Sequence, residues 1–101
     1  MALNWNNEEL EAVVRSYLDM KNKELKGIKF TKVSYYRKLS KKFGRSEKSY
    51  EMRMRNISFV YYHKGKDWLI GLKPLRHVGS NVFAKIEEII EKIEKEKYLL
   101  N

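Results

Sequence analysis

Residues 45–58, RSEKSYEMRMRNIS, combine a helix start with a helical pattern of apolar side chains. Ser46 is a suitable N-cap residue, because its hydroxyl can accept a hydrogen bond from an amide of the first helical turn. At about 100° per residue, two sets of side chains project from opposite sides of the helix. The inward set is Tyr50, Met54, Ile57 and Tyr61, and the outward set is Lys48, Met52 and Arg55. The stretch therefore predicts a helix with a buried side and a polar, basic outer face.

A second helical pattern ends just before this stretch. Thr31 can cap a helix, and Gly44 marks its end because glycine readily adopts the left-handed conformation that follows a helix. The apolar positions expected to face the core are Val33, Tyr36, Leu39 and Phe43. Because only Gly44 and Arg45 separate this helix from the cap at Ser46, the sequence predicts a helix-turn-helix-like pair.

Two further helices are predicted, one on each side of this pair. The first begins at Asn6 or Asn7 and ends before Gly27, and the last runs from Ser80 or Asn81 nearly to the C-terminus. Residues 63–80 hold three glycines and the only proline, which indicates a loop with a short extended piece at residues 68–72. We therefore predict one mainly α domain over residues 1–101, a four-helix domain with a short extended loop or hairpin before the last helix.

The last helix has an apolar side and a charged side. Its outward charges have the i,i+4 spacing of surface ion pairs, Glu88 with Lys92 and Glu91 with Lys95. The apolar spacing at residues 82, 86, 89 and 93 also suits a coiled coil, but barely two heptads fit and position 96 is a glutamate. We therefore expect weak or no homo-oligomerisation.

The net charge of +9 is concentrated in the middle of the chain. Residues 31–80 hold 13 Lys and Arg against 3 Asp and Glu, whereas the two ends are close to neutral. Such a local excess is typical of a nucleic-acid-binding surface, since each neutralised phosphate releases condensed counterions. A solvated lysine-rich surface and a surface for an acidic protein partner are the alternatives.

Other classes of protein are disfavoured by what the sequence lacks. There is no cysteine for a disulfide or a thiolate metal site, no apolar run long enough for a membrane span, and no signal peptide at the start. His63 and His77 flank the loop without neighbouring ligands, and no nucleophile or phosphate-cradling motif is present. We expect a cytoplasmic binding module without cofactor, metal or catalytic activity.

The candidate DNA contacts divide by chemistry. Phosphate contacts are expected from Lys32, Lys38, Lys41, Lys42, Lys48, Lys73 and Arg76, which position the protein, whereas Ser49, Met52, Arg55 and Asn56 are the candidates for reading bases. Ser46 and the amides beside it can hold a phosphate at the helix N-terminus. Two structural alternatives are open, since Met52 could pack against a loop and Asn56 could satisfy loop backbone groups. RNA binding is less favoured, because no aromatic pair on a sheet platform is evident.

Residues along nearly the whole chain resemble the N-terminal head domain of McrA-type HNH nucleases, which are modification-dependent restriction enzymes. The residues that carry the resemblance are Trp5, Glu8, Glu9, residues 25–27, Arg45, Ser46, Ser49, Tyr50, Glu51, Arg53, residues 56–58, Val60 and residues 71–74. The opening Trp5 and glutamate pair is also similar to Myb/SANT-like domains, which leaves a regulatory or phage-type interaction module as the alternative.

The resemblance implies a double-stranded DNA-binding module, in some members one that reads cytosine carrying a 5-methyl or 5-hydroxymethyl group. The positions that match the family signature are Arg45, Ser46, Ser49, Glu51, Arg53, Asn56, Lys73 and Pro74, and the resemblance thereby adds Arg45 and Arg53 to the DNA-binding candidates. The sequence departs from the family at His77 and Gly79, which stand where the family often has Asn and Gln; His77 is kept as a candidate because it could face a phosphate. The resemblance also implies a nuclease domain as a partner in a longer protein, so the chain is either a head domain or a stand-alone binder.

Overall fold

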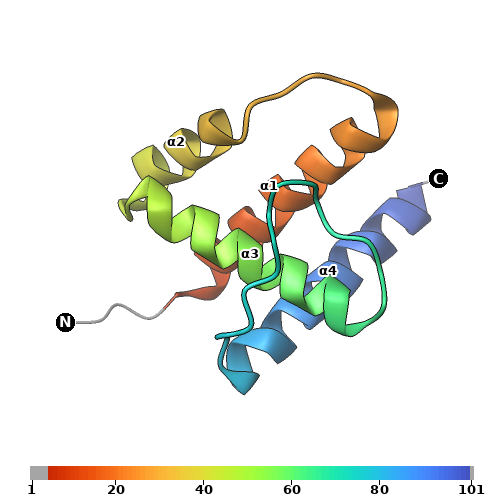
Figure 1. Cartoon of the computed structure of the whole chain (residues 1–101). Coiled ribbons are helices and arrows are strands. Elements are labelled where there is room, and N and C mark those ends of the chain that lie inside the picture. Colours follow the sequence, from red (N-terminus) through yellow and green to blue (C-terminus); the bar gives the residue numbers. More distant parts are fainter. Residues whose placement is uncertain (1–4, 101) are drawn as a thin grey trace.

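The computed structural model describes residues 5–100, with side chains as far as Lys97, and contains four α-helices. They are α1 at Asn7–Lys26, α2 at Lys32–Phe43, α3 at Glu47–His63 and α4 at Ser80–Leu100 (Figure 1). Residues 5–100 contain no β-strand, and a turn in which Leu72 N donates to Leu69 O interrupts the segment expected to be extended. The predicted mainly α, four-helix fold is confirmed, with a loop before α4.

Local capping chemistry accounts for the starts of α1 and α3, whereas Thr31 stands at the N-cap of α2 without a side-chain capping hydrogen bond. Asn6 Oδ1 accepts a hydrogen bond of 2.8 Å from Glu9 N, and Ser46 Oγ accepts one of 3.2 Å from Ser49 N. Gly44 adopts a φ of 93° and donates its amide to Ser40 O, so the chain reverses between α2 and α3 without steric cost. These contacts lie within a few residues of each helix end, which is why the sequence predicted the boundaries.

The core lies where α3 contacts all three other helices, and α1 also packs against α2 and α4. Tyr50, Met54 and Ile57 are fully buried, as their helical spacing predicted. One prediction for α2 is wrong, because Val33 is 43% exposed while Leu39 is buried. Val33 projects about 120° around the helix axis from Leu39, so the two cannot both face the same core.

Ion pairs join α1 to α4 across the outside of the core. Glu11 Oε1 lies 2.8 Å from Lys92 Nζ, and Arg15 Nη2 lies 2.9 Å from Glu96 Oε1. Lys92 therefore bonds to the neighbouring helix, whereas the sequence predicted a pair with Glu88 on its own helix. The i,i+4 rule treats a helix as isolated, and a nearer carboxylate on α1 competes successfully here.

The long loop between α3 and α4 is held against the core by one buried phenol. Tyr17 OH on α1 accepts a hydrogen bond of 3.0 Å from Leu69 N and lies 2.9 Å from Ser58 Oγ on α3. Leu69 and Leu72 are buried on either side of the turn. Figure 1 shows the loop crossing in front of the helices before it enters α4.

We expect Tyr17→Phe to lower the free energy of unfolding by about 1–3 kcal/mol, because it leaves the buried Leu69 amide and Ser58 hydroxyl without a shared partner. Urea unfolding measures the change. Tyr62→Phe is the matched control, since the Tyr62 side chain is largely exposed and should change stability by less than about 0.5 kcal/mol. Equal effects from both variants would contradict the assigned role of Tyr17.

Acid should weaken the contact between α1 and α4. Hydrogen bonds from Lys92 and then Arg15 hold the pKa of Glu11 below its ordinary value of 4.5. A carboxyl whose pKa is lowered by folding stabilises the protein above its unfolded pKa and loses that contribution as pH falls through the folded value. Thermal unfolding of wild type should therefore show a steeper loss of stability below about pH 4.5 than Glu11→Gln. Glu91→Gln, at an exposed position of α4, should retain the wild-type slope.

Candidate nucleic-acid interface

The N-terminal half of α3 presents an accessible polar face, which we call the α3 face and define by Lys48, Ser49, Met52 and Arg55. Met52 is 43% exposed, so a large part of this apolar residue stays open to solvent. Lys48 is exposed, and Ser49 and Arg55 are partly exposed. Three kinds of group therefore lie on one helix surface, namely cations, a hydroxyl and an apolar, polarisable thioether.

Carboxylates reduce the positive charge at the edges of the α3 face. Lys48 Nζ lies 3.1 Å from Glu51 Oε1, and Arg37 Nε on α2 lies 3.9 Å from Glu47 Oε2. All four side chains are at least one-third exposed. Exposed pairs of this kind contribute at most about 1 kcal/mol, so an anionic ligand can displace them at small cost.

The loop is attached to the C-terminal end of the α3 face by two hydrogen bonds at Arg55, one from its side chain and one to its backbone carbonyl. Arg55 Nε donates to Lys73 O at 2.9 Å, and Leu75 N donates to Arg55 O at 3.0 Å. These bonds place the basic loop residues Lys73 and Arg76 beside the helix. Two predicted groups far apart in sequence, on α3 and in the loop, thus belong to one surface.

Asn56 does not belong to that surface. Only 5% of it is exposed; its Nδ2 donates to Leu75 O at 2.8 Å, and its Oδ1 accepts from Arg53 Nη1 at 3.0 Å. The amide nitrogen holds the loop and the amide oxygen holds Arg53, which favours the structural alternative for Asn56 over base reading. Asn56 lies one turn beyond Met52 and about 40° around the helix axis from it, so it projects from the same side of α3, at a level where the loop covers it.

Arg45 and Arg53 also have internal partners. Arg45 Nε lies 2.8 Å from Oε2 of the buried Glu9, and this oxygen also accepts the Tyr50 hydroxyl at 3.0 Å. Both guanidinium carbons lie over the Trp5 ring, at 4.1 Å for Arg45 and 4.7 Å for Arg53. We call these five residues the Trp5 cluster, and it joins the start of α1 to α3.

Arg53 is the least compensated member of the Trp5 cluster. Its Nε is buried and is the one such side-chain N or O atom without a hydrogen-bond partner among the described residues. Burial, followed by the nearby Arg45, lowers the pKa of the Arg53 guanidinium. The sequence did not predict this cluster, because Glu9 lies in the first turn of α1, where a carboxylate is favourable in itself, and its partner Arg45 is 36 residues away.

The remaining basic candidates are spread over α2 and the loop. Those on α2 are Lys38, Lys41 and Lys42, all exposed, and those in the loop are Lys73, Arg76 and His77, also exposed. Lys32 is partly buried, and its Nζ lies against Gly71, where a Cβ atom would approach it to 3.0 Å. Ser46 is exposed, but its Oγ bonds with Ser49 N and lies 2.9 Å from Ser49 Oγ.

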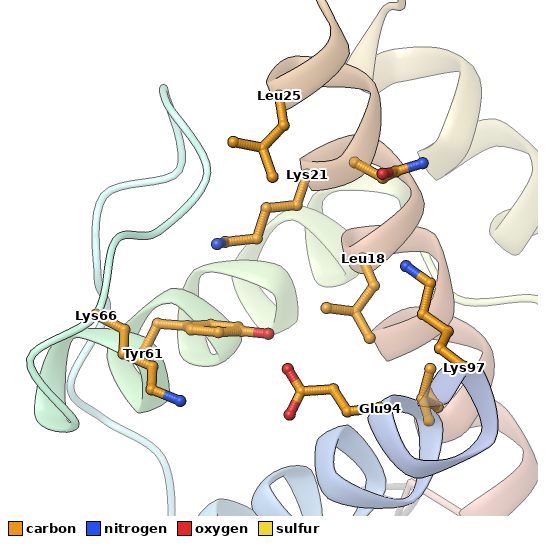
Figure 2. Close-up of a pocket in the computed structure, with 9 residues that line it drawn as sticks. Leu18, Lys21, Leu25, Tyr61, Lys66, Glu94 and Lys97 are labelled. Carbon is orange, nitrogen blue, oxygen red and sulfur yellow. The ribbon is translucent and has the colours of Figure 1, made fainter. Parts of the chain in front are cut away.

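A pocket lined by several lysines lies away from the α3 face, between α1, the end of α3 and α4. It has a volume of about 250 Å³, and its lining includes three lysines, Lys21, Lys66 and Lys97, one carboxylate, Glu94, and apolar side chains such as Leu18. Figure 2 shows Lys21 and Lys66 beside Tyr61, whose hydroxyl is directed toward Glu94. Burial, with a smaller contribution from Glu94, raises the pKa of Tyr61, so the phenol stays neutral.

Comparison with known proteins adds no relative to this description. No family model matches the chain, and no curated protein or solved structure matches it either. Among the residues described, no group of three or more His, Asp or Glu side chains could hold a metal ion, and no helix is long and apolar enough to cross a membrane.

The anchoring role of Asn56 can be measured without a ligand. Asn56→Ala should lower the free energy of unfolding by about 1–3 kcal/mol, because Leu75 O and the Arg53 guanidinium lose a buried partner. Amide exchange of Leu75 should also accelerate. Met52→Ala, on the exposed side of the same helix, should change stability by less than about 0.5 kcal/mol. An Asn56→Ala variant as stable as wild type would refute the anchoring role.

Proposed function

We propose that this protein binds double-stranded DNA through the α3 face, the basic side of α2 and the basic residues of the loop. The observation that supports this most directly is the α3 face, a helix surface with exposed cations and a thioether that ends at a basic loop bonded to the same helix. A helix that enters the major groove needs side chains of this kind near its N-terminus and a preceding helix near the backbone.

In this proposal, the charged groups divide into positioning and reading contacts. Lys38, Lys41 and Lys42 on α2 and Arg76 in the loop contact phosphates, which fixes the protein on the duplex without selecting a sequence. Lys48 and Arg55 address base edges or nearby phosphates, and Ser49 is a further hydrogen-bonding group on the same face. Asn56 has no part in base recognition, because its amide holds the loop.

Met52 is the residue that bears on which bases the α3 face recognises. An exposed thioether among polar groups makes apolar contact with a methyl group in the major groove, whether that of thymine or that of a 5-substituted cytosine. Combined with the residues similar to McrA-type head domains, this supports recognition of modified cytosine by a module that targets an HNH nuclease in a longer, cytoplasmic protein. Titration into matched duplexes with unmodified, methylated and hydroxymethylated cytosine tests both levels. Absence of binding to all three at micromolar protein would refute DNA binding.

Mutations can separate reading from positioning. We expect Arg55→Ala to cost about 1–3 kcal/mol of binding free energy on the preferred duplex and to relax sequence preference. Lys41→Ala should weaken all duplexes alike and reduce the slope of log affinity against log salt by about one. Fluorescence anisotropy at several salt concentrations measures both quantities.

The Arg55 variant needs a control, because Arg55 Nε also holds Lys73 O. Met52→Ala changes the same face without removing a hydrogen bond to the loop, so it should reduce the preference for a 5-substituted base while leaving the salt slope unchanged. Urea unfolding of each variant shows whether folding is affected. Identical profiles for Met52→Ala, Arg55→Ala and Lys41→Ala would contradict specific readout by α3.

Binding of an acidic protein partner is the second candidate function, and the pocket in Figure 2 is the observation that favours it. Three lysines beside apolar side chains suit a segment that carries both carboxylates and an apolar side chain. This pocket shares no residue with the α3 face, so the two functions are separable. Duplex DNA should compete with a partner bound at the α3 face and leave a partner bound at the Lys21 pocket in place.

A further inference from the structure

A groove lined by aromatic and cationic side chains lies where the end of α3 meets the loop. Its lining residues are Phe59, Tyr62, Trp68, Lys73, Pro74 and Arg76, and its volume is about 380 Å³. We call it the Tyr62 groove. Tyr62 is 57% exposed and Trp68 is 36% exposed, so two large rings face outward on a protein whose other large aromatics are mostly buried or half-buried.

The rings of the groove are held by contacts on their inner side. Phe59 lies 6.2 Å from Tyr62 at an interplanar angle of 33° and packs edge-on against Phe83 of α4 at 6.0 Å. Trp68 lies 5.8 Å from Tyr62 at 72°. These fixed, differently oriented rings leave aromatic surface that is not covered by the fold.

The loop side of the groove is fixed by hydrogen bonds already described. Leu69, next to Trp68, is held by the Tyr17 hydroxyl, and the Lys73 carbonyl is held by Arg55 Nε. The groove is therefore largely formed before any ligand arrives, which lowers the entropic cost of binding.

The charged side chains beside the rings indicate which chemical class of ligand fits the groove. Lys73 and Arg76 are both exposed, neither forms an ion pair with a described carboxylate, and no Asp or Glu lines the groove. A ligand that uses both features has a flat aromatic face and a negative charge a short distance away. A nucleotide has this combination, with its base on the rings and its phosphate near the cations.

We propose that the Tyr62 groove binds an unpaired base of a single nucleic-acid strand, with the adjoining phosphates at Lys73 and Arg76. Bases inside a duplex are stacked on one another and cannot offer a free face to Tyr62 or Trp68. The Tyr62 groove and the α3 face therefore bind different forms of nucleic acid in these proposals, although Lys73 lies beside both. The protein would contact a strand where it leaves a duplex or where the duplex is open.

The test measures binding of labelled oligothymidine and, separately, of a blunt duplex by fluorescence anisotropy. Tyr62→Ala should weaken oligothymidine binding about tenfold, the size expected when one base loses its stacking partner, and should leave duplex affinity within about twofold. Tyr62→Phe, which keeps the ring and removes only the hydroxyl, should bind oligothymidine within about twofold of wild type. An oligoribouridine arm shows whether the site distinguishes the two sugars.

Trp68 provides a second readout that does not depend on Tyr62 variants. Oligothymidine should quench tryptophan fluorescence, and Trp68→Phe should abolish the quenching while the signal from Trp5 remains. Absence of oligothymidine binding at micromolar protein and low salt would overturn the proposal, as would binding that Tyr62→Ala and Lys41→Ala weaken equally. Binding of a proline-rich peptide at the groove, with no oligonucleotide binding, would also overturn it, since aromatic-lined grooves accept such peptides.

The outcomes distinguish this proposal from the proposed duplex binding. Oligothymidine binding that depends on Tyr62, without binding to any duplex, supports the Tyr62 groove and refutes the function assigned to the α3 face. Duplex binding that depends on Arg55, without oligothymidine binding, does the reverse.

Discussion

The buried hydrogen bonds that attach the loop between α3 and α4 to the helices determine where the basic and aromatic side chains of that loop lie. Tyr17 holds Leu69, and Asn56 holds Leu75, each through a side chain that would be costly to bury without a partner. A loop of this length has no regular backbone pairing of its own, so these side chains satisfy amides and carbonyls that the fold removes from water. The position of Lys73, Pro74 and Arg76 follows from them.

The Trp5 cluster is the second set of contacts on which the structure depends. It gives internal partners to several residues that the sequence analysis assigned to DNA binding. Trp5, Arg45, Tyr50, Arg53 and Asn56 are connected through rings, guanidinium groups and one buried carboxylate. Their chemistry, with arginines and an asparagine on a basic helix, is also that of DNA recognition, and sequence reasoning cannot separate the two uses. In this fold, each has an internal partner. Packing within the protein is therefore enough to account for these residues.

Because these residues have internal partners, the proposed DNA-binding surface is smaller than the sequence indicated. The α3 face retains Lys48, Ser49, Met52 and Arg55, the exposed lysines of α2 add charge, and the loop adds Lys73 and Arg76. The Tyr62 groove continues this surface toward the end of α3, with Lys73 beside both. A duplex offers base edges in its grooves, and the polar groups of the α3 face suit such edges. An unpaired base also offers its flat face, which suits the rings of the Tyr62 groove. The pocket around Lys21 shares no residue with either.

Four helices, the caps at Asn6 and Ser46, the buried side of α3 and the concentration of positive charge could be predicted from the sequence, because each depends on neighbours within a few residues or on simple counts. The sequence did not determine what covers the outward side of a helix. The burial of Asn56, the pairing of Glu9 with Arg45, the exposure of Val33 and the meeting of Tyr62 with Trp68 depend on segments far apart in the chain. Helical periodicity gives the direction of a side chain around its own axis, whereas only the tertiary structure decides which other segment lies in that direction.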